Sequence, residues 1–322
     1  MIIVTGGAGF IGSAVIWKLN ELGREDILVV DRLGASDKWK NLVNRRYLDY
    51  MHKTLFLDKL LNGEIDNIEA IIHMGACSST TERDADYLME NNFHYSRRLA
   101  QYAVYRNIRF INASSAATYG DGSRGFSDHP DFLDRLAPLN MYGYSKHLFD
   151  VWARRNRVLD RLVSLKFFNV FGPNEYHKED MRSVVVKAFA QVREQGVIRL
   201  FKSYRDDYED GGQKRDFVYV KDCAGIIGRL LENPAVNGIY NVGTGRARTW
   251  NDLALAVFSA MDISPRIEYI DMPEMLRDRY QYFTEAEMDR LAGTGCPVAM
   301  TDLESAVADY VKNYLQAADP YL

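Results

Sequence analysis

The first twelve residues, Met1-Ile2-Ile3-Val4-Thr5-Gly6-Gly7-Ala8-Gly9-Phe10-Ile11-Gly12, decide the fold class. A short β-rich run, Met1–Val4, leads into closely spaced glycines, and apolar residues at helical spacing follow over Ala8–Leu22. Glycines allow a tight turn between strand and helix and let backbone N–H groups approach a pyrophosphate, which the positive end of the helix attracts. The glycines satisfy GxGxxG and GxxGxxG together, and we expect Gly6, Gly9 and Gly12 to form a dinucleotide-binding turn.

A second predicted strand, Asp26–Val30, is followed by Asp31, which lies nineteen residues after Gly12. An acidic residue at this position hydrogen-bonds the adenosine ribose, and by itself it favours NAD because it would repel a 2′-phosphate. Three cations follow on the next loops, Arg32, Lys38 and Lys53, and they could offset that repulsion. The residues alone leave NAD and NADP both open.

Strand-like and helix-like segments alternate along the chain, which predicts an α/β fold with a Rossmann-like, doubly wound parallel sheet. The expected strands are Ala70–Met74, Phe110–Ala113, Val163–Phe167, Asp216–Val220 and Gly238–Val242. The expected helices are Glu82–Arg106, Tyr142–Arg157, Asn251–Met261 and Thr301–Leu315. We expect residues 1–170 with about 214–261 to form the dinucleotide-binding domain. Less regular stretches, about 171–213 and 262–322, should form a smaller, mostly C-terminal α/β substrate lobe.

Composition excludes several classes of protein. The chain has 322 residues and a formal net charge of −4, without the basic excess of a general nucleic-acid binder. No run approaches 18 consecutive apolar residues, so no membrane span is expected. Three cysteines without a CxxC pair and six scattered histidines predict neither a disulfide framework nor a metal site. A cytoplasmic location is the simplest reading.

An acid–base group is predicted at Tyr142, Lys146 and Ser115. Tyr142 and Lys146 are four residues apart, so they share one face of a predicted helix. A nearby ammonium favours the phenolate, and use of tyrosine as a base near pH 7 requires its pKa to fall by about 3 units. Ser115 follows a predicted strand, at the end that faces the ligand crevice, and can hydrogen-bond the same substrate oxygen.

Together these motifs resemble the extended short-chain dehydrogenase/reductase superfamily, whose members act on nucleotide sugars. Within it the chain resembles the ADP-glyceromanno-heptose 6-epimerase family over nearly its whole length. The segments that carry this closer resemblance are His73–Glu82, Ser114–Gly120, Tyr142–Asp150, His177-Lys178, Arg279-Tyr280-Gln281 and Phe283-Thr284.

The resemblance implies an isomerase that converts ADP-D-glycero-D-manno-heptose into ADP-L-glycero-D-manno-heptose and supplies heptose for the lipopolysaccharide inner core. In this mechanism tightly bound NADP oxidises C6 to a ketone and returns the hydride to the opposite face. Tyr142 would serve one substrate orientation and Lys178 the other, while Lys146 positions the cofactor. Ring-like homo-oligomers, homopentamers, are also implied.

Further site residues are implied by the resemblance alone. The cofactor contacts would include Phe10, Ile11, Asp31, Arg32, Lys38, Lys53, Met74, Gly75, Ala76, Cys77, Ser78, Asn91, Tyr142, Lys146 and Lys178. The substrate contacts would include Ser115, Asn169, Val170, Asp180, Lys187, Phe201, Lys202, Ser203, Tyr204, Arg215 and Tyr280.

Two alternatives belong beside this interpretation. One is another nucleotide-sugar enzyme of the superfamily, such as a UDP-hexose 4-epimerase or a dehydratase. A dehydratase would place acidic residues next to the Ser115 position, where this chain has Ala116-Ala117. The other is a catalytically inactive, NADP-sensing binding protein, which would be expected to lack the tyrosine or the lysine.

Overall fold

The computed structural model describes residues 1–277, 280–296 and 299–322. Its centre is a seven-stranded sheet in which every neighbouring pair is parallel. In spatial order the strands are β11 (Gly238–Val242), β6 (Val163–Phe167), β5 (Arg109–Ser115), β4 (Ala70–His73), β1 (Ile2–Thr5), β2 (Ile27–Asp31) and β3 (Asp49–His52). The predicted fold class is confirmed.

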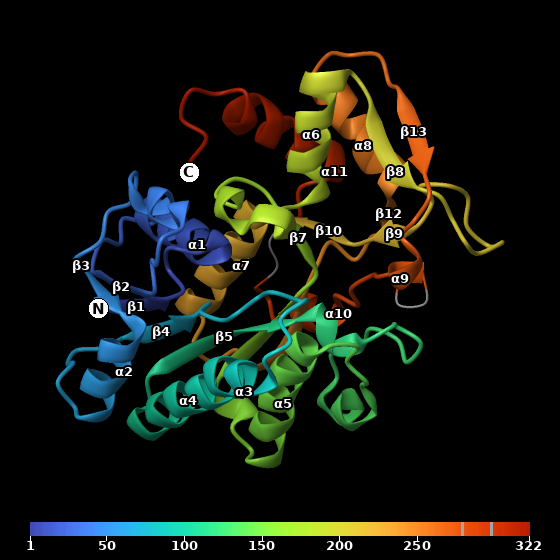
Figure 1. Ribbon diagram of the computed structural model, residues 1–322. Coiled ribbons are helices and arrows are strands. Elements are labelled where there is room, and N and C mark those ends of the chain that lie inside the picture. The colour runs from blue at the N-terminus through green and yellow to red at the C-terminus, as the bar shows by residue number, and fades with distance from the viewer. Residues whose placement is uncertain (278–279, 297–298) are drawn as a thin grey trace.

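The sheet is buried on both faces because helices cover each side (Figure 1). Along β1, Ile2 and Val4 pack on one face with α1 (Phe10–Glu21) and α7 (Val220–Glu232), and Ile3 packs on the other. The other face is covered by α2 (Lys53–Leu61), α4 (Tyr95–Arg106) and α5 (Met141–Arg155). This alternation follows from the two-residue period of a strand.

The strand order reverses beside β1, which positions the site. From β1 the chain runs outward through β2 and β3, then returns to β4 on the other side of β1 and continues outward. The loops after β1 and β4 therefore leave the sheet side by side at its carboxyl edge. A crevice at such a switch point is where α/β proteins bind ligands.

A second group of elements lies above this edge (Figure 1). Its core joins α6 (Val184–Gln195), α8 (Trp250–Ala260) and α11 (Leu303–Tyr310). Three two-stranded sheets accompany it: β7 (Asn169–Phe171) with β10 (Phe217–Tyr219), β9 (Lys214–Arg215) with β12 (Arg248–Thr249), and β8 (Ile198–Phe201) with β13 (Ile267–Ile270). The short helix α9 (Glu274–Arg277) lies near β9, whereas α3 (Ala85–Leu88) lies beside α4 and α5, and α10 (Asp289–Ala292) packs near β11 of the main sheet (Figure 1).

Several expected elements differ from the observed ones. The helix expected over Glu82–Arg106 begins later, at α3, which Asp84 caps. A π-helix, η2 (Met89–His94), then separates α3 from α4. The stretch 171–213, expected to be irregular, contains α6 and β8. The strand expected over Asp216–Val220 is the shorter β10, Phe217–Tyr219, because α7 begins at Val220. The helix expected over Thr301–Leu315 becomes α11 followed by a π-helix, η7 (Val311–Leu315).

The division into two domains stays a prediction. One helix packs differently from the expected division. The residues of α8 fall within the expected dinucleotide-binding domain, but α8 shares its apolar core with α6 and α11. Within the described ranges, no helix combines the length and apolar character needed to cross a bilayer.

Candidate active site

The turn between β1 and α1 is closely packed. Gly6 has φ +65°, and a Cβ added there would lie 2.6 Å from the Gly75 backbone, on the loop after β4. A Cβ on Gly12 would lie 2.1 Å from the Gly6 carbonyl oxygen. Only glycine fits these two positions, because any side chain would collide with backbone. The predicted glycines therefore bring β1, β4 and α1 together at the switch point.

Asp31 lies at the end of β2, next to the turn. Its carboxylate accepts hydrogen bonds from the Ala8 N–H at 2.9 Å and the Arg32 N–H at 2.6 Å, and pairs with the Lys38 ammonium at 2.6 Å. A cavity of about 130 Å³ opens here, and its lining includes Gly6, Asp31, Arg32, Lys38, Lys53, Gly75, Ala76 and Asn91. The carboxylate and cations expected around an adenosine ribose thus lie together.

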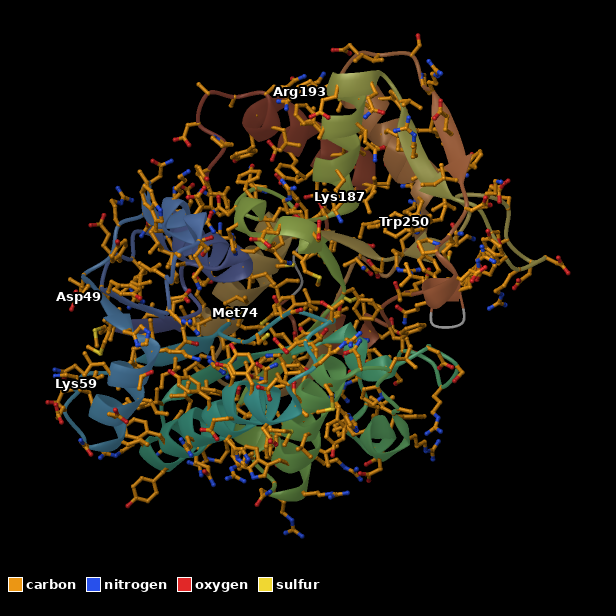
Figure 2. The ribbon with its side chains drawn as sticks, viewed as in Figure 1. Asp49, Lys59, Met74, Lys187, Arg193 and Trp250 are labelled. Atoms are coloured by element: carbon orange, nitrogen blue, oxygen red, sulfur yellow. The ribbon has the colours of Figure 1, made fainter. Side chains whose placement is uncertain are left out.

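Asn92 anchors the Met74–Ser78 loop through hydrogen bonds, and the sequence did not identify it as a site residue. The Asn92 side chain accepts from the Cys77 N–H at 2.8 Å and donates to the Cys77 carbonyl at 3.0 Å and to Ser145 Oγ at 3.0 Å. Its neighbour Asn91 contacts the Lys53 ammonium. Both asparagines belong to the π-helix η2, a distortion that often marks functional sites. Met74 lies centrally in the molecule (Figure 2).

The predicted acid–base group is assembled between β5 and α5. Asn140 caps α5 by accepting from the Gly143 N–H at 2.8 Å, so Tyr142 lies in the first turn. Ser115 ends β5, where its hydroxyl oxygen accepts from the Ala117 N–H at 3.1 Å, and its proximity to the Tyr142 phenol lowers the pKa of that phenol. Lys146, 3% exposed, donates from Nζ to the Ala113 carbonyl at 2.7 Å. Strand end and helix start therefore bring all three residues together.

Burial controls the protonation of this group. It raises the pKa of Tyr142, against a smaller lowering effect of Ser115. The loss of hydration thus outweighs the favourable contact, and the lowered pKa that a tyrosine base requires stays a prediction. Burial lowers the pKa of Lys146 to about 8, opposed by the Asp150 carboxylate, so the ammonium form still predominates at neutral pH.

Behind the site lies a buried polar network that the sequence analysis also missed. Lys166 on β6 and Asp150 on α5 are both 0% exposed and form an ion pair at 3.0 Å. The Asp150 carboxylate also accepts from Ser114 Oγ at 2.6 Å and Ser164 Oγ at 2.7 Å. Asp150 is four residues beyond Lys146, a spacing that the sequence displays. The network joins α5 to β5 and β6, and thereby fixes the helix that carries Tyr142.

Lys178 belongs to a separate group above α1. It lies on the 3-10 helix η6 (Tyr176–Met181), with its ammonium 5.3 Å from the centre of the Phe10 ring. Burial lowers the pKa of Lys178, and the nearby Glu175 carboxylate opposes this effect. Met181 Sδ lies 4.0 Å from Thr80 Oγ1, so this segment faces the loop that follows β4.

Three of the predicted substrate residues form a cationic aromatic cluster. Arg215, 7% exposed, lies 5.3 Å from the Tyr280 ring centre and 5.7 Å from that of Trp250. Phe201 packs edge-on against Tyr280, with ring centres 6.4 Å apart. The guanidinium donates one hydrogen bond, to the Lys214 carbonyl at 2.8 Å, and retains further N–H groups.

The remaining predicted substrate residues are more dispersed. Asn169 and Val170 lie on β7, where Asn169 Oδ1 accepts from Thr284 Oγ1 at 3.3 Å. The Asp180 carbonyl accepts from Lys187 Nζ at 2.7 Å, and Lys187 and Trp250 lie high in the molecule (Figure 2). Lys202 and Tyr204 both contact Asp271, and the Ser203 N–H donates to Asp210. Arg279 lies outside the described residues.

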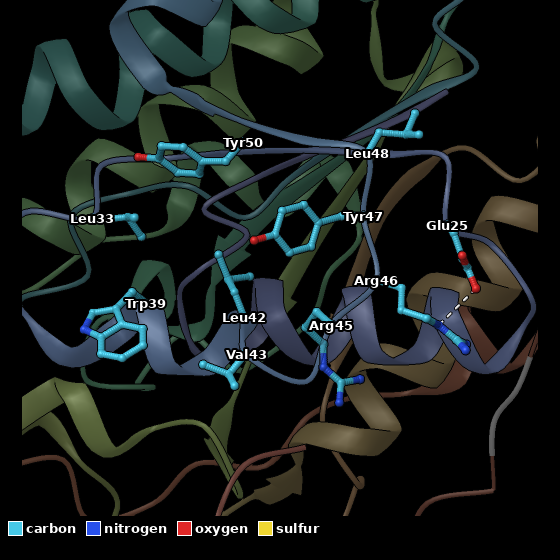
Figure 3. Close-up of a pocket in the computed structure, with 10 residues that line it drawn as sticks. All are labelled: Glu25, Leu33, Trp39, Leu42, Val43, Arg45, Arg46, Tyr47, Leu48 and Tyr50. Carbon is cyan, nitrogen blue, oxygen red and sulfur yellow. Dashed lines mark ion pairs between the residues drawn. The ribbon is translucent and has the colours of Figure 1, made fainter.

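A pyridine dinucleotide fits the residues around the glycine turn. Added side chains would close the turn at Gly6 and Gly12, and Asp31 with its neighbouring cations lines the adjoining cavity. A larger open pocket of about 720 Å³ lies beyond β2, against residues that include Trp39, Arg46 and Tyr47 (Figure 3). None of the residues that line it is a predicted site residue. Among the described residues, no three His, Cys, Asp or Glu side chains are grouped to hold a metal ion.

Comparison with known proteins agrees with this geometry. The NAD dependent epimerase/dehydratase family matches residues 2–243. The ADP-L-glycero-D-manno-heptose-6-epimerases of Nitratidesulfovibrio vulgaris (strain DP4) and Fusobacterium nucleatum subsp. nucleatum are 65% and 51% identical, each over 100% of both chains. The crystal structure of the Helicobacter pylori ADP-L-glycero-D-manno-heptose-6-epimerase superposes with a TM-score of 0.80 at 26% identity, covering 97% of this chain and 95% of that one. The chain therefore belongs to the NAD dependent epimerase/dehydratase family, within its group of ADP-L-glycero-D-manno-heptose-6-epimerases.

Proposed function

We propose that the protein inverts C6 of the heptose in ADP-D-glycero-D-manno-heptose and so forms ADP-L-glycero-D-manno-heptose. The observation that carries this proposal is the group of buried Lys146 with partly buried Tyr142 and Ser115, at the same sheet edge as the glycine turn. Full-length identity of 65% to an enzyme of that name supports the choice of substrate. The product would supply heptose for the lipopolysaccharide inner core.

The reaction requires oxidation because C6 bears a secondary alcohol whose C–H is not acidic. A ketone at C6 is planar, so return of hydride to its other face inverts the centre. A pyridine dinucleotide whose pyrophosphate is held at the glycine turn would supply the hydride acceptor and donor through its nicotinamide ring. The side chains must then bind the sugar, exclude water and move the hydroxyl proton.

Tyr142 is the proposed proton acceptor in one orientation of the sugar. Ser115 lowers the pKa of the Tyr142 phenol, and the ammonium of Lys146, one helical turn further along α5, would favour the same negative charge. Because burial alone raises the pKa of Tyr142, these contacts are needed to bring its proton transfer toward neutral pH.

Lys178 is the proposed proton-transfer group for the opposite orientation. Its partly desolvated ammonium has a lowered pKa, which suits a group that must both give and take a proton. Its position over Phe10 places it at the start of α1, on the segment that faces the Met74–Ser78 side of the crevice.

Arg215 is proposed to bind the diphosphate of the ADP group, with the rings of Tyr280, Phe201 and Trp250 packed around it. A planar guanidinium binds phosphate oxygens through paired N–H groups, and the aromatic rings fix its plane. The dispersed residues on β7, α6 and the loop after β8 would complete the substrate lobe.

NADP is the proposed form of the cofactor. Lys38 already neutralises Asp31, and Arg32 and Lys53 line the same cavity, so a 2′-phosphate would meet three cations. Enzymatic identification of the dinucleotide released on denaturation tests this choice, and recovery of NAD alone would refute it.

Homopentameric assembly and a cytoplasmic location are carried forward as proposals from the family resemblance. Light scattering on the purified chain tests the assembly, and a mass other than five subunits would reject it.

Two substitutions test the acid–base assignment. Tyr142→Phe should reduce turnover by about 10²–10⁴-fold while the dinucleotide stays bound, because only the proton acceptor is lost. Tyr144→Phe is the matched control, since Tyr144 is a 45% exposed tyrosine on the same helix and should retain the wild-type rate. Lys178→Met should also slow turnover by at least tenfold. Loss of dinucleotide with activity intact in Tyr142→Phe would reject the role of Tyr142.

A further inference from the structure

The turn that carries Lys178 has little stability of its own. The 3-10 helix η6 spans six residues, and Glu179 within it has φ 47° and ψ −121°, so the helical hydrogen-bonding is interrupted directly after Lys178. The orientation of such a short segment is set by what it contacts. Its contacts come from three distant parts of the chain.

Asn174, four residues before Lys178, is the main junction. It adopts φ +77° and is 0% exposed. Its side-chain amide donates to Ser13 Oγ on α1 at 2.9 Å, and its Oδ1 accepts from the Leu322 N–H at 3.0 Å. Its carbonyl accepts from Asn41 Nδ2 at 3.0 Å, and the same Asn41 amide donates to the Ala8 carbonyl in the glycine turn at 2.9 Å.

Tyr176 makes the second attachment, to the segment 319–322. Its hydroxyl donates to the Pro320 carbonyl at 2.8 Å, and its ring packs edge-on against Tyr321 with centres 5.4 Å apart. Asp319 in turn accepts from Asn44 Nδ2 at 2.8 Å. Figure 1 shows this red end of the chain descending beside the blue α1 region.

Leu322 supports the surface on which the Lys178 ammonium rests. It is 6% exposed and belongs to the same apolar cluster as Phe10, Ala14, Val220 and Ala224. The Lys178 ammonium lies over the Phe10 ring of that cluster. The segment 319–322 therefore contacts both the turn that carries the lysine and the cluster that contains its aromatic neighbour.

We propose that Asn174 and the segment 319–322 are positioning elements for Lys178, holding its ammonium at the start of α1 where the sugar must be reached. This inference rests on the proposed role of Lys178 in proton transfer. Neither element touches the reacting atoms, so each acts only through the lysine. A displacement of the ammonium by about 1 Å could lower the rate by about 10²-fold.

The test uses Asn174→Gly and Tyr176→Phe in the full-length protein. Glycine keeps the left-handed backbone at 174 and removes the bonds to Ser13 and Leu322. Tyr176→Phe removes only the hydroxyl bond to Pro320, and it serves as the milder variant should Asn174→Gly fold poorly. The matched control is Asn67→Gly, an exposed asparagine that also has positive φ, at 56°.

Epimerisation is followed by proton NMR, with KM, bound dinucleotide and the thermal midpoint measured in parallel. We expect Asn174→Gly to lower kcat at least tenfold and Tyr176→Phe at least threefold, with KM and dinucleotide content within twofold of wild type. In a Lys178→Met background, either substitution should lower the residual rate by no more than twofold, because the group that they position is already absent.

The outcomes separate the two proposals. A wild-type rate in Asn174→Gly and Tyr176→Phe, with Lys178→Met impaired, overturns the positioning role and leaves the role of Lys178 standing. Equal losses with and without Lys178 also overturn it, because they indicate a general structural effect. A wild-type rate in Lys178→Met refutes the proton-transfer role itself, and the positioning role with it.

Discussion

Replacement of Lys166 by methionine should destabilise the protein strongly. Lys166 and Asp150 are both 0% exposed and 3.0 Å apart, and Lys166 also donates to Thr118 Oγ1 at 2.6 Å. Removal of one partner from a buried pair costs about 3–5 kcal/mol, because the other charge stays buried without its counter-ion. Asp150 keeps the hydroxyl donors of Ser114 and Ser164, which places the expected loss near the lower end, about 3 kcal/mol.

Urea unfolding monitored by tryptophan fluorescence measures this loss as a difference in the free energy of unfolding. The double variant Lys166→Met/Asp150→Asn should recover most of it, because neither charge remains. Lys59→Met is the surface control, since Lys59 pairs with Glu64 at 3.4 Å in an exposed position and should cost at most about 1 kcal/mol. A loss for Lys166→Met no larger than that of the control, or a double variant as unstable as the single one, would refute the reasoning.

Three further predictions concern the glycine turn, the buried lysine Lys146 and the buried histidine His73. Gly12→Ala should abolish dinucleotide retention, measured by absorbance after denaturation, whereas Gly228→Ala, where the nearest atom to an added Cβ is 3.4 Å away, should retain it. Because the pKa of Lys146 is lowered to about 8, kcat should fall as pH rises through that value, and Lys146→Arg should remove this limb; a limb near pH 10.5 would contradict the assignment. Burial lowers the pKa of His73 to about 3, so below its unfolded value of about 6.5 only the unfolded chain takes up the proton and stability falls with decreasing pH. His73→Asn should make the loss of stability between pH 6.5 and 4.5 smaller by about 2–3 kcal/mol, and an unchanged pH dependence in urea titrations would reject this.

The features that the sequence predicted correctly are those encoded by local spacing. The glycine turn and Asp31 follow consecutive strands, and Tyr142 and Lys146 lie one helical turn apart. Their meeting at the sheet edge follows from the parallel topology, because carboxyl ends of neighbouring strands lie side by side.

The features that sequence reasoning missed depend on partners far apart in the chain. Asn174 contacts Asn41 across 133 positions and Leu322 across 148. The sequence places Lys166 in a predicted strand and Asp150 in a predicted helix, and nothing in it pairs the two residues. No local pattern reports which buried charge will find which counter-ion.

The burial of Tyr142 is likewise not visible in the sequence. The sequence shows the neighbouring lysine but not how deeply the phenol is enclosed, and in the structure this enclosure raises the pKa of Tyr142. The prediction that 171–213 is irregular was wrong, because Val185, Phe189 and Val192 have the spacing of a helix, which is α6.

The measurement that tests the central claim most directly is proton NMR of ADP-D-glycero-D-manno-heptose incubated with the purified protein and no added cofactor. The account predicts signals of the C6 epimer, ADP-L-glycero-D-manno-heptose, formed with dinucleotide that the protein already holds. An unchanged spectrum, even after addition of NADP and then NAD, would contradict the proposed substrate and reaction.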